Sequence, residues 1–396
     1  MNILIYIPDI SQEWGGIRQY AVTLIKMLRE IKGNRYFIYH DLNDKEVIQA
    51  IAGRQEYVLV TSIEIYTKET IRKKVPIYRF DGLPVLGKLK FYRNSTVTNG
   101  LDFYCQQQDI RIVHCPYQYI PFVKKVKLIT TMHDVQEIHF PEFFTAEERA
   151  SRAKNYLDCL SRADCIVVSY NHIKEDLIKY FNVPEENIKT ILLQMDKLWF
   201  DKFSDEDITS LPVNLNSTCY LLYPANAWKH KNHIRLMEAV AQVRDEDNTI
   251  INVAFTGDFN SEYGKHVVKK RNELILQEQV TFLGVMDEKV LFALYKGAVA
   301  VVIPTLYEAG SFPLMESIFL GVPVICSNVT SLPETIGDND FIFDPVDIFS
   351  FKEKLKQLWT DDDFRKRSIT NSSLQKQKLT NTNSVDKLAA LYQSVC

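Results

Sequence analysis

Two carboxylates, Glu308 and Glu316, flank a short stretch that could hold a phosphorylated ligand. They lie within "YEAGSFPLMES" (307–317), directly after the apolar run "AVAVVIPT" (298–305). The apolar run predicts a buried strand, and Pro313 predicts the first turn of a helix, where its missing N–H has no intrahelical partner. The junction between a strand and a helix, at the carboxyl edge of a parallel sheet, is where open α/β folds bind ligands.

The predicted helix start offers donors for an anion. The N–H groups near Ser311, Phe312 and Leu314 have no partner inside the helix, and the helix dipole adds partial positive charge there. Gly310 has no side chain, so a ligand can approach its backbone closely. These features predict a phosphate site between the two acids.

A phosphate is repelled by carboxylates, so the two acids need a different ligand group. Carboxylate oxygens accept hydrogen bonds from sugar hydroxyls. We therefore predict a nucleotide-sugar site, with Glu308 facing the hexose and Glu316 facing the ribose. The competing interpretation is structural, with Glu308 as a loop acid and Glu316 as a first-turn acid stabilised by the helix dipole.

Three other positions follow predicted strands. Gly15 and Gly16 open a helix after the first strand, where free N–H groups again face the sheet edge, although a plain turn also explains a glycine pair. Lys231 could meet a diphosphate as a point charge, or be a solvated surface lysine. His133 ends a strand, where a histidine is more often structural, and Asp134 beside it is predicted to orient loops by hydrogen bonding.

The elements that must position these residues form two series of short apolar runs. The first series comprises 2–8, 35–40, 57–63, 110–116, 127–134, 165–170 and 189–193. The second comprises 219–225, 249–257, 280–284, 298–305, 322–327 and 341–344. Amphipathic helical patterns separate the runs, among them 16–31, 233–244 and 288–298. Strands that are apolar throughout are covered on both faces, which implies parallel pairing with crossover helices.

The chain has 396 residues, too many for one ordinary core. The rhythm of strands and helices breaks at 194–217, which is polar and predicts a linker. We expect two doubly wound α/β domains, residues 1–195 and 196–383, with the amphipathic segment 384–396 packing back on the first. Residues 372–384 are polar enough for a loop.

Composition narrows the class of protein. A net charge of −3 gives no signature of nucleic-acid binding, and seven cysteines without a CxxC predict buried thiols in a reducing compartment. The first ten residues predict a strand rather than a signal peptide. Four acidic triplets could be mistaken for a metal-binding D-x-D, but they fall in polar connections or helix starts and predict solvated loops: 205–207, 245–247, 338–340 and 361–363.

The block "YEAGSFPLMESIFLGVPVICSNVTSLPETIGDND" resembles the E-x7-E region of family-4 retaining glycosyltransferases, which have the GT-B fold. Ala309 and Ser311 stand where that motif usually has glycines. Other motifs match in order: "GGIRQY" at 15–20, "HD" at 133–134, "WKHKN" at 228–232 and "VTFLG" at 280–284. Residues 65–105 match no part of the family.

The resemblance implies a fold and roles for particular residues. The fold is two Rossmann-like domains facing a central cleft. The catalytic residues would be His133, Glu308 and Lys231, with His133 contacting the donor sugar near its reacting carbon. Many family members have an arginine where this chain has Asn226, so one phosphate-binding cation is missing unless Lys229 or His230 supplies it. The implied donor-binding set is Gly15, Gly16, Asn226, His230, Lys231, Gly310, Ser311, Phe312, Pro313 and Glu316.

The predicted function is transfer of a hexose from a GDP- or UDP-linked sugar to a glycan or lipid-linked glycan, with retention of configuration, in cell-surface polysaccharide synthesis. We expect no cofactor and no metal, since Lys231 and the helix starts could offset the charge of the diphosphate. The alternatives are another GT-B enzyme, such as a nucleotide-sugar epimerase, or a non-catalytic GT-B subunit. The sequence does not specify the sugar, the base, the acceptor or the oligomeric state.

Residues 68–93 combine eight lysines and arginines with interleaved apolar residues. Basic and apolar side chains together favour contact with an anionic membrane surface, although a solvated insertion explains the composition as well. We therefore expect a cytoplasmic protein that can contact the inner face of the membrane peripherally.

Overall fold

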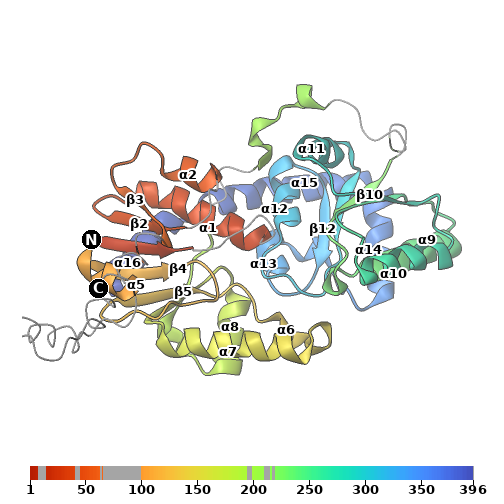
Figure 1. The fold of residues 1–396 in the computed structure, drawn as a ribbon. Helices are drawn as coiled ribbons and strands as arrows, with labels where there is room; N and C mark the ends of the chain where they lie inside the picture. The colour runs from red at the N-terminus through yellow and green to blue at the C-terminus, as the bar shows by residue number, and fades with distance from the viewer. Residues whose placement is uncertain are drawn as a thin grey trace, which may run out of the picture. The chain divides into compact units, whose positions relative to one another are not determined.

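A computed structural model describes residues 1–7, 15–40, 45–62, 65, 100–193, 199–208, 215 and 219–395. The chain forms two compact units. The amino-terminal unit comprises Met1–Val135, Phe144–Gln194 and Asn383–Cys396, and the carboxy-terminal unit comprises Gln136–Phe143 and Met195–Thr382. Each unit contains one parallel sheet with helices, so the predicted doubly wound α/β class is confirmed (Figure 1).

The amino-terminal unit is built on a seven-stranded sheet of order β3-β2-β1-β4-β5-β6-β7. Its strands are β1 (Asn2–Tyr6), β2 (Arg35–Tyr39), β3 (Tyr57–Val60), β4 (Ile110–Cys115), β5 (Lys127–Thr131), β6 (Cys165–Val168) and β7 (Ile188–Thr190). All pairs are parallel. The order reverses between β1 and β4, which makes that pair the switch point of the sheet.

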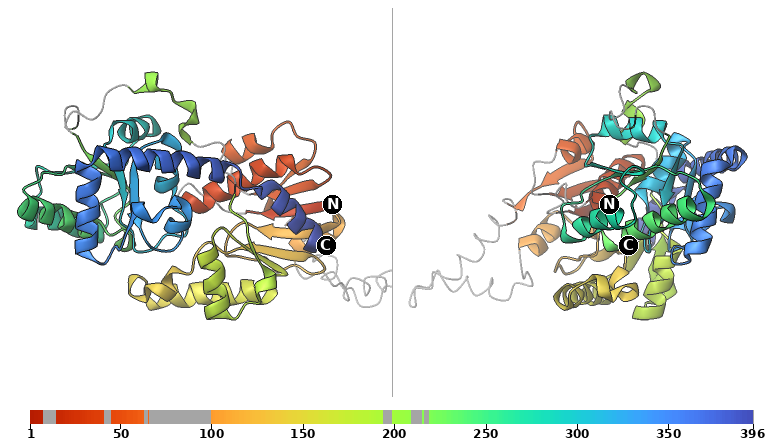
Figure 2. Two further views of the ribbon diagram at one scale, coloured as in Figure 1. Left: turned by 180° about the vertical axis from the view of Figure 1, so that it is seen from behind. Right: turned by 90° about the vertical axis from the view of Figure 1, so that its right-hand side faces the viewer.

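Helices cover both faces of this sheet, because every parallel connection needs a crossover. One face packs against α1 (Gly15–Met27), α2 (Lys45–Ile51) and α16 (Ser384–Val395), whose Leu388, Leu391 and Tyr392 are buried there. The other packs against α5 (Gly100–Gln107) and Cys159 of α7 (Ala146–Arg162). α8 (Asn171–Phe181) connects β6 to β7. The carboxyl-terminal helix thus completes the amino-terminal core (Figure 2).

The carboxy-terminal unit is built on a six-stranded parallel sheet of order β10-β9-β8-β11-β12-β13. Its strands are β8 (Leu221–Pro224), β9 (Val253–Thr256), β10 (Val280–Gly284), β11 (Ala300–Ile303), β12 (Val324–Ser327) and β13 (Ile342–Phe343). The switch point lies between β8 and β11. Residues after these two strands therefore meet at one place on the carboxyl edge.

The helices of this unit pack in two groups. α9 (His233–Asp247) contacts α10 (Glu262–Glu273) and α14 (Ile348–Thr360). α12 (Phe312–Leu320) contacts α11 (Glu288–Gly297), α13 (Leu332–Ile336) and α15 (Asp362–Thr380). Short helices α6 (Gln136–His139) and η4 (Pro141–Phe143), which follow β5 in the chain, belong to this unit, and the Phe140 ring lies edge-on to Tyr307 at 6.5 Å.

The structure corrects two expectations, namely that residues 372–384 form a loop and that the cysteines are buried. Most of 372–384 is helical rather than a loop, since Asp361 caps α15 and Ser368, Ser372 and Gln375 form part of its buried face. Packing overrides the weak helical pattern here. Cys219 is exposed, whereas the other five described cysteines are buried.

Two predicted segments lie largely outside the described residues. They are the linker 194–217, of which only 199–208 and 215 are described, and the basic segment 68–93, none of which is described. Within the described ranges, no helix combines the length and apolarity needed to cross a membrane.

Candidate functional site

The carboxyl edge of the carboxy-terminal sheet brings the main predicted residues together. The loop after β8 contains Lys231 in the short 3-10 helix η9 (Lys229–Lys231), and the loop after β11 contains Glu308. The two loops are tied by their backbones, since Leu306 N–H and Thr305 Oγ1 both donate to the His230 carbonyl, at 2.7 and 2.9 Å. The site therefore occupies the switch point of this sheet.

Lys231 and Glu308 form an ion pair at this edge. Lys231 Nζ lies 2.6 Å from Glu308 Oε1, and the two side chains are only 12% and 9% exposed. A buried charge without a partner is strongly destabilising, so each residue compensates the other. The residues predicted to bind diphosphate and hexose therefore contact one another directly.

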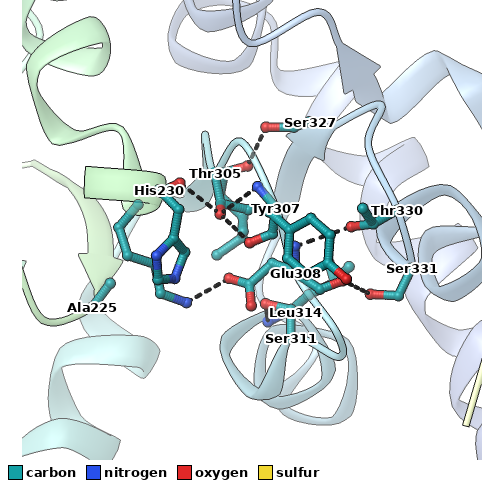
Figure 3. A network of polar contacts seen from close by, with 12 residues as sticks. Ala225, His230, Thr305, Tyr307, Glu308, Ser311, Leu314, Ser327, Thr330 and Ser331 are labelled. Atoms are coloured by element: carbon teal, nitrogen blue, oxygen red, sulfur yellow. Dashed lines mark hydrogen bonds and ion pairs between the residues drawn. The ribbon is translucent and has the colours of Figure 1, made fainter. Parts of the chain in front are cut away.

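The backbone of Glu308 is held from both sides by the loop that follows β12 (Figure 3). Glu308 N–H donates to Thr330 Oγ1 at 3.0 Å, and Ser331 Oγ donates to the Glu308 carbonyl at 3.0 Å. Thr305 Oγ1 also lies 2.8 Å from the Tyr307 carbonyl. Hydrogen bonds from neighbouring loops thus fix the backbone that carries this carboxylate.

α12 starts as predicted but presents fewer free donors. Ser311 is its N-cap, and Pro313 occupies the first turn. The prediction that Leu314 N–H is free for an anion is wrong, because Ser311 Oγ accepts it at 3.4 Å. Gly310 and Phe312 are partly exposed beside the cap. The Ser311 side chain therefore occupies one of the donors predicted for an anion.

His230 cannot supply the missing cation. Burial, with Lys231 and His233 nearby, lowers the pKa of His230 to about 3, so the ring is neutral near pH 7. Asn226 is engaged within the protein, since its Oδ1 accepts the Asp258 N–H at 2.8 Å. Lys229 is exposed, with its Nζ 5.9 Å from the centre of the Phe143 ring.

Glu316 has a different environment from Glu308. It is buried, and its two oxygens each accept a hydrogen bond from a neutral donor: Trp199 Nε1–H at 2.7 Å and Tyr295 O–H at 2.6 Å. Burial raises the pKa of Glu316, and the two hydrogen bonds oppose that rise. The sequence predicts that this carboxylate faces ribose, but it does not predict these two donors within the protein.

The remaining predicted residues lie in the amino-terminal unit. His133 follows β5, donates from Nε2–H to the Pro116 carbonyl at 2.8 Å, and lies edge-on to Tyr20 at 4.7 Å. Burial lowers the pKa of His133, so it is neutral near pH 7. Gly15 and Gly16 begin α1, as expected.

Asp134 has the predicted loop-orienting contacts. Its carboxylate forms an ion pair with Arg152, and its carbonyl accepts a hydrogen bond from Gln118 at 3.2 Å.

Sequence reasoning missed several residues that shape the site. Trp199 and Tyr295 gave no signal, because neither lies near a strand end. Thr330 and Ser331 follow a predicted strand and could have been found by that position. Gly257 ends the predicted strand 249–257, where its φ of +111° and the 2.6 Å that would separate an added Cβ from the Ala225 carbonyl explain why a glycine is needed.

Comparisons with known proteins identify the class. Residues 14–192 match the Glycosyltransferase Family 4 model, and residues 212–375 match the model of Glycosyl transferases group 1. The chain is 25% identical over 285 residues to the O-antigen chain mannosyltransferase B of Escherichia coli, covering 71% of this chain and 74% of that protein. It is also 25% identical to the O-antigen chain mannosyltransferase RfbU of Salmonella typhimurium, covering 63% and 65%.

Solved structures show the same fold. Anabaena HepE in complex with UDP-glucose superposes with a TM-score of 0.68 at 16% identity, and all of each chain is covered. Sucrose-phosphate synthase from Thermosynechococcus elongatus gives 0.65 at 16% identity, with 100% and 98% covered. The two family models match consecutive parts of the chain, one mainly in each of the two units. The chain is therefore a glycosyltransferase with the GT-B fold, whose amino-terminal part matches the family-4 model and whose carboxy-terminal part matches the group-1 model.

Proposed function

We propose that this enzyme transfers a hexose, with mannose the first candidate, from a nucleoside-diphosphate sugar to a glycan or lipid-linked glycan in cell-surface polysaccharide synthesis. The observation that carries the proposal is the ion pair of Lys231 and Glu308 at the switch point, beside the start of α12. The relatives named as O-antigen mannosyltransferases support the sugar and the pathway class. The solved complexes of HepE with UDP and UDP-glucose support a nucleotide-sugar donor.

In this proposal, donor binding exchanges the partners of the ion pair. Lys231 turns from Glu308 to the diphosphate, whose leaving oxygens it stabilises, and Glu308 then accepts hydroxyls of the hexose. The backbone contacts of Glu308 keep its position fixed during this exchange. The enzyme contributes positioning and charge stabilisation of the leaving group.

Retention of configuration without a side-chain nucleophile requires the acceptor to attack the face of the sugar from which the diphosphate departs. Glu308 is assigned to hydroxyl binding and His133 to contact near the reacting carbon, so the departing diphosphate assists attack by the acceptor on the same face. The neutral state of His133 suits contact with an uncharged sugar.

The direct test is turnover with a panel of GDP- and UDP-linked hexoses and lipid-linked oligosaccharide acceptors. Product mass and anomeric configuration by NMR are the measurements. We expect transfer of mannose with retention. Release of nucleoside diphosphate without any acceptor would instead indicate an epimerase, and no binding of any nucleotide sugar would indicate a non-catalytic subunit.

We also propose that catalysis needs no divalent metal, because Lys231 and the start of α12 supply the positive charge. Turnover should persist in excess EDTA. Complete loss, restored by manganese or magnesium, contradicts this proposal.

A lipid-linked acceptor requires the enzyme to reach a membrane surface. We propose that residues 68–93, which lie outside the described structure, make this contact, since each lysine or arginine near an anionic surface contributes about 1 kcal/mol. The protein should sediment with phosphatidylglycerol vesicles at low salt and be released at high salt. Replacement of Arg72, Lys73 and Lys74 by glutamate should abolish sedimentation, and a folded protein that ignores the vesicles at low salt contradicts the contact.

A further inference from the structure

A short segment within the predicted linker 194–217 is fastened to one helix of the carboxy-terminal unit. We name residues 199–208 the strap; it comprises η6 (Trp199–Lys202) and η7 (Asp205–Asp207). The Phe203 ring lies 5.5 Å from that of Phe292 on α11. Three ion pairs join the strap to the same helix: Lys202 with Glu288, Asp207 with Lys289, and Asp205 with Lys296.

The strap and α11 both reach Glu316. From the strap, Trp199 Nε1–H donates to Oε1 at 2.7 Å, and from α11, Tyr295 O–H donates to Oε2 at 2.6 Å. Tyr295 is fully buried, and Glu316 is 8% exposed. Each oxygen of the carboxylate therefore has one fixed donor from a different element.

These contacts leave the carboxylate able to accept further bonds. An ionised carboxylate has about four acceptor sites, of which the two donors use one on each oxygen. Two fixed donors on opposite oxygens restrict rotation about the terminal torsion, which is otherwise broad. The remaining acceptor sites are consequently held in fixed directions.

We propose that Trp199 and Tyr295 are positioning residues that orient Glu316 for the ribose hydroxyls of the donor nucleotide. The inference rests on the proposed function, a nucleotide-sugar donor, together with the sequence prediction that Glu316 faces the ribose of that donor. It adds that the strap, a part of the linker between the two units, takes part in donor recognition through one indole N–H. The ion pairs between the strap and α11 join the two elements that carry the donors Trp199 and Tyr295.

A purely structural role for the two donors makes a different prediction. If they only satisfy a buried carboxylate, their removal lowers the stability and weakens every nucleotide equally. If they orient Glu316, their removal weakens the ribonucleotide more than a nucleotide without ribose hydroxyls. The ratio of the two affinities therefore distinguishes the roles.

The experiment measures the affinities of the full-length enzyme for UDP and GDP and for their 2′,3′-dideoxy counterparts by calorimetry. We expect the wild-type enzyme to prefer the ribonucleotide by about 10- to 100-fold, as befits hydrogen bonds to a charged acceptor. Glu316→Gln should reduce that preference strongly. Trp199→Phe and Tyr295→Phe should each reduce it about 3- to 10-fold and leave affinity for the dideoxynucleotide nearly unchanged.

Matched controls exist in the same unit. Tyr220→Phe removes another buried tyrosine hydroxyl, which donates to the Leu294 carbonyl at 2.8 Å, and Trp359→Phe replaces a tryptophan on α14. Both controls should keep the wild-type preference. Trp199 and Tyr295 are tested separately, so that one misfolded variant, recognised by circular dichroism, leaves the other to decide.

The outcomes distinguish the ribose role of Glu316 from the positioning role of Trp199 and Tyr295. A wild-type enzyme with no preference for ribonucleotides overturns the ribose role of Glu316 and this inference with it. A wild-type preference that Glu316→Gln removes but Trp199→Phe and Tyr295→Phe retain overturns the positioning role alone.

Discussion

The carboxyl edges of the two sheets have the same architecture but differ in their charged groups. In the carboxy-terminal unit, the edge holds a buried cation and a buried carboxylate 2.6 Å apart. In the amino-terminal unit, the corresponding edge holds a neutral histidine, His133, packed against the ring of Tyr20. Parallel sheets create a binding edge in either case, and the side chains after the strands decide which chemistry it suits.

The difference matches the two parts of the proposed donor. Its diphosphate carries negative charge that needs a fixed cation, whereas its hexose, which His133 is proposed to contact, is uncharged. Glu308 and Glu316 repeat this contrast within one edge, since one carboxylate pairs with a cation and the other with two neutral donors.

The largest effect should come from removing the cation. Lys231→Met is expected to lower kcat/KM by about 100- to 1,000-fold, because the leaving diphosphate loses a fixed charge. It should also destabilise the fold by about 3–5 kcal/mol, because Glu308 is left buried without its partner. Initial-rate kinetics and urea unfolding are the measurements.

Two controls sharpen this test. Lys229→Met, at the exposed neighbouring lysine, should change neither quantity appreciably. The double variant Lys231→Met with Glu308→Gln should recover most of the stability and none of the turnover. Equal losses for Lys229→Met and Lys231→Met would contradict the assignment of the cation.

The two units should nevertheless respond alike to acid, because each buries a neutral histidine. Burial lowers the pKa of His114 and of His233 to about 3, below the unfolded value, so stability is complete above about pH 6.5 and is lost as the pH falls. Each of the two histidines should lower the free energy of unfolding by about 2 kcal/mol at pH 5 relative to pH 7. Urea unfolding at both pH values checks this: His114→Gln and His233→Gln should each reduce the acid-dependent loss by that amount, and an unchanged loss disproves it.

A smaller effect is expected when the carboxylate of the ion pair is neutralised. Glu308→Gln releases Lys231 from its partner, so a bare nucleoside diphosphate should bind about tenfold more tightly, equivalent to about 1.4 kcal/mol. Turnover should fall at the same time, because hexose hydroxyls lose a charged acceptor. Calorimetry with UDP and GDP measures the first change, and weaker binding would show that the ion pair does not compete with the diphosphate.

The smallest effect tests how far burial explains the strength of the Lys231 pair. Lys202 and Glu288 form an ion pair whose side chains are 57% and 54% exposed. Lys202→Met should cost less than about 1 kcal/mol in the free energy of unfolding, since water screens exposed pairs. A loss comparable to that of Lys231→Met would remove burial as the reason for the difference.

Much of the fold was determined by the sequence itself. Each of the thirteen predicted apolar runs contains or overlaps one strand, because short apolar runs are typical of strands covered on both faces. The start of α12 was also predictable, because Ser311 and Pro313 are typical of helix starts at their positions. The strand ends then identified Lys231 and Glu308 as candidates.

Only the tertiary structure decided which candidates meet. Lys231 and Glu308 are 77 positions apart, and their contact depends on β8 lying beside β11, a pairing that no local pattern encodes. Glu316 accepts a hydrogen bond from Trp199, which is 117 positions away, because the strap packs on α11 through pairs of side chains. The neutral state of His230 likewise results from burial, because the pKa depends on the surroundings that the folded chain creates and not on the residue type.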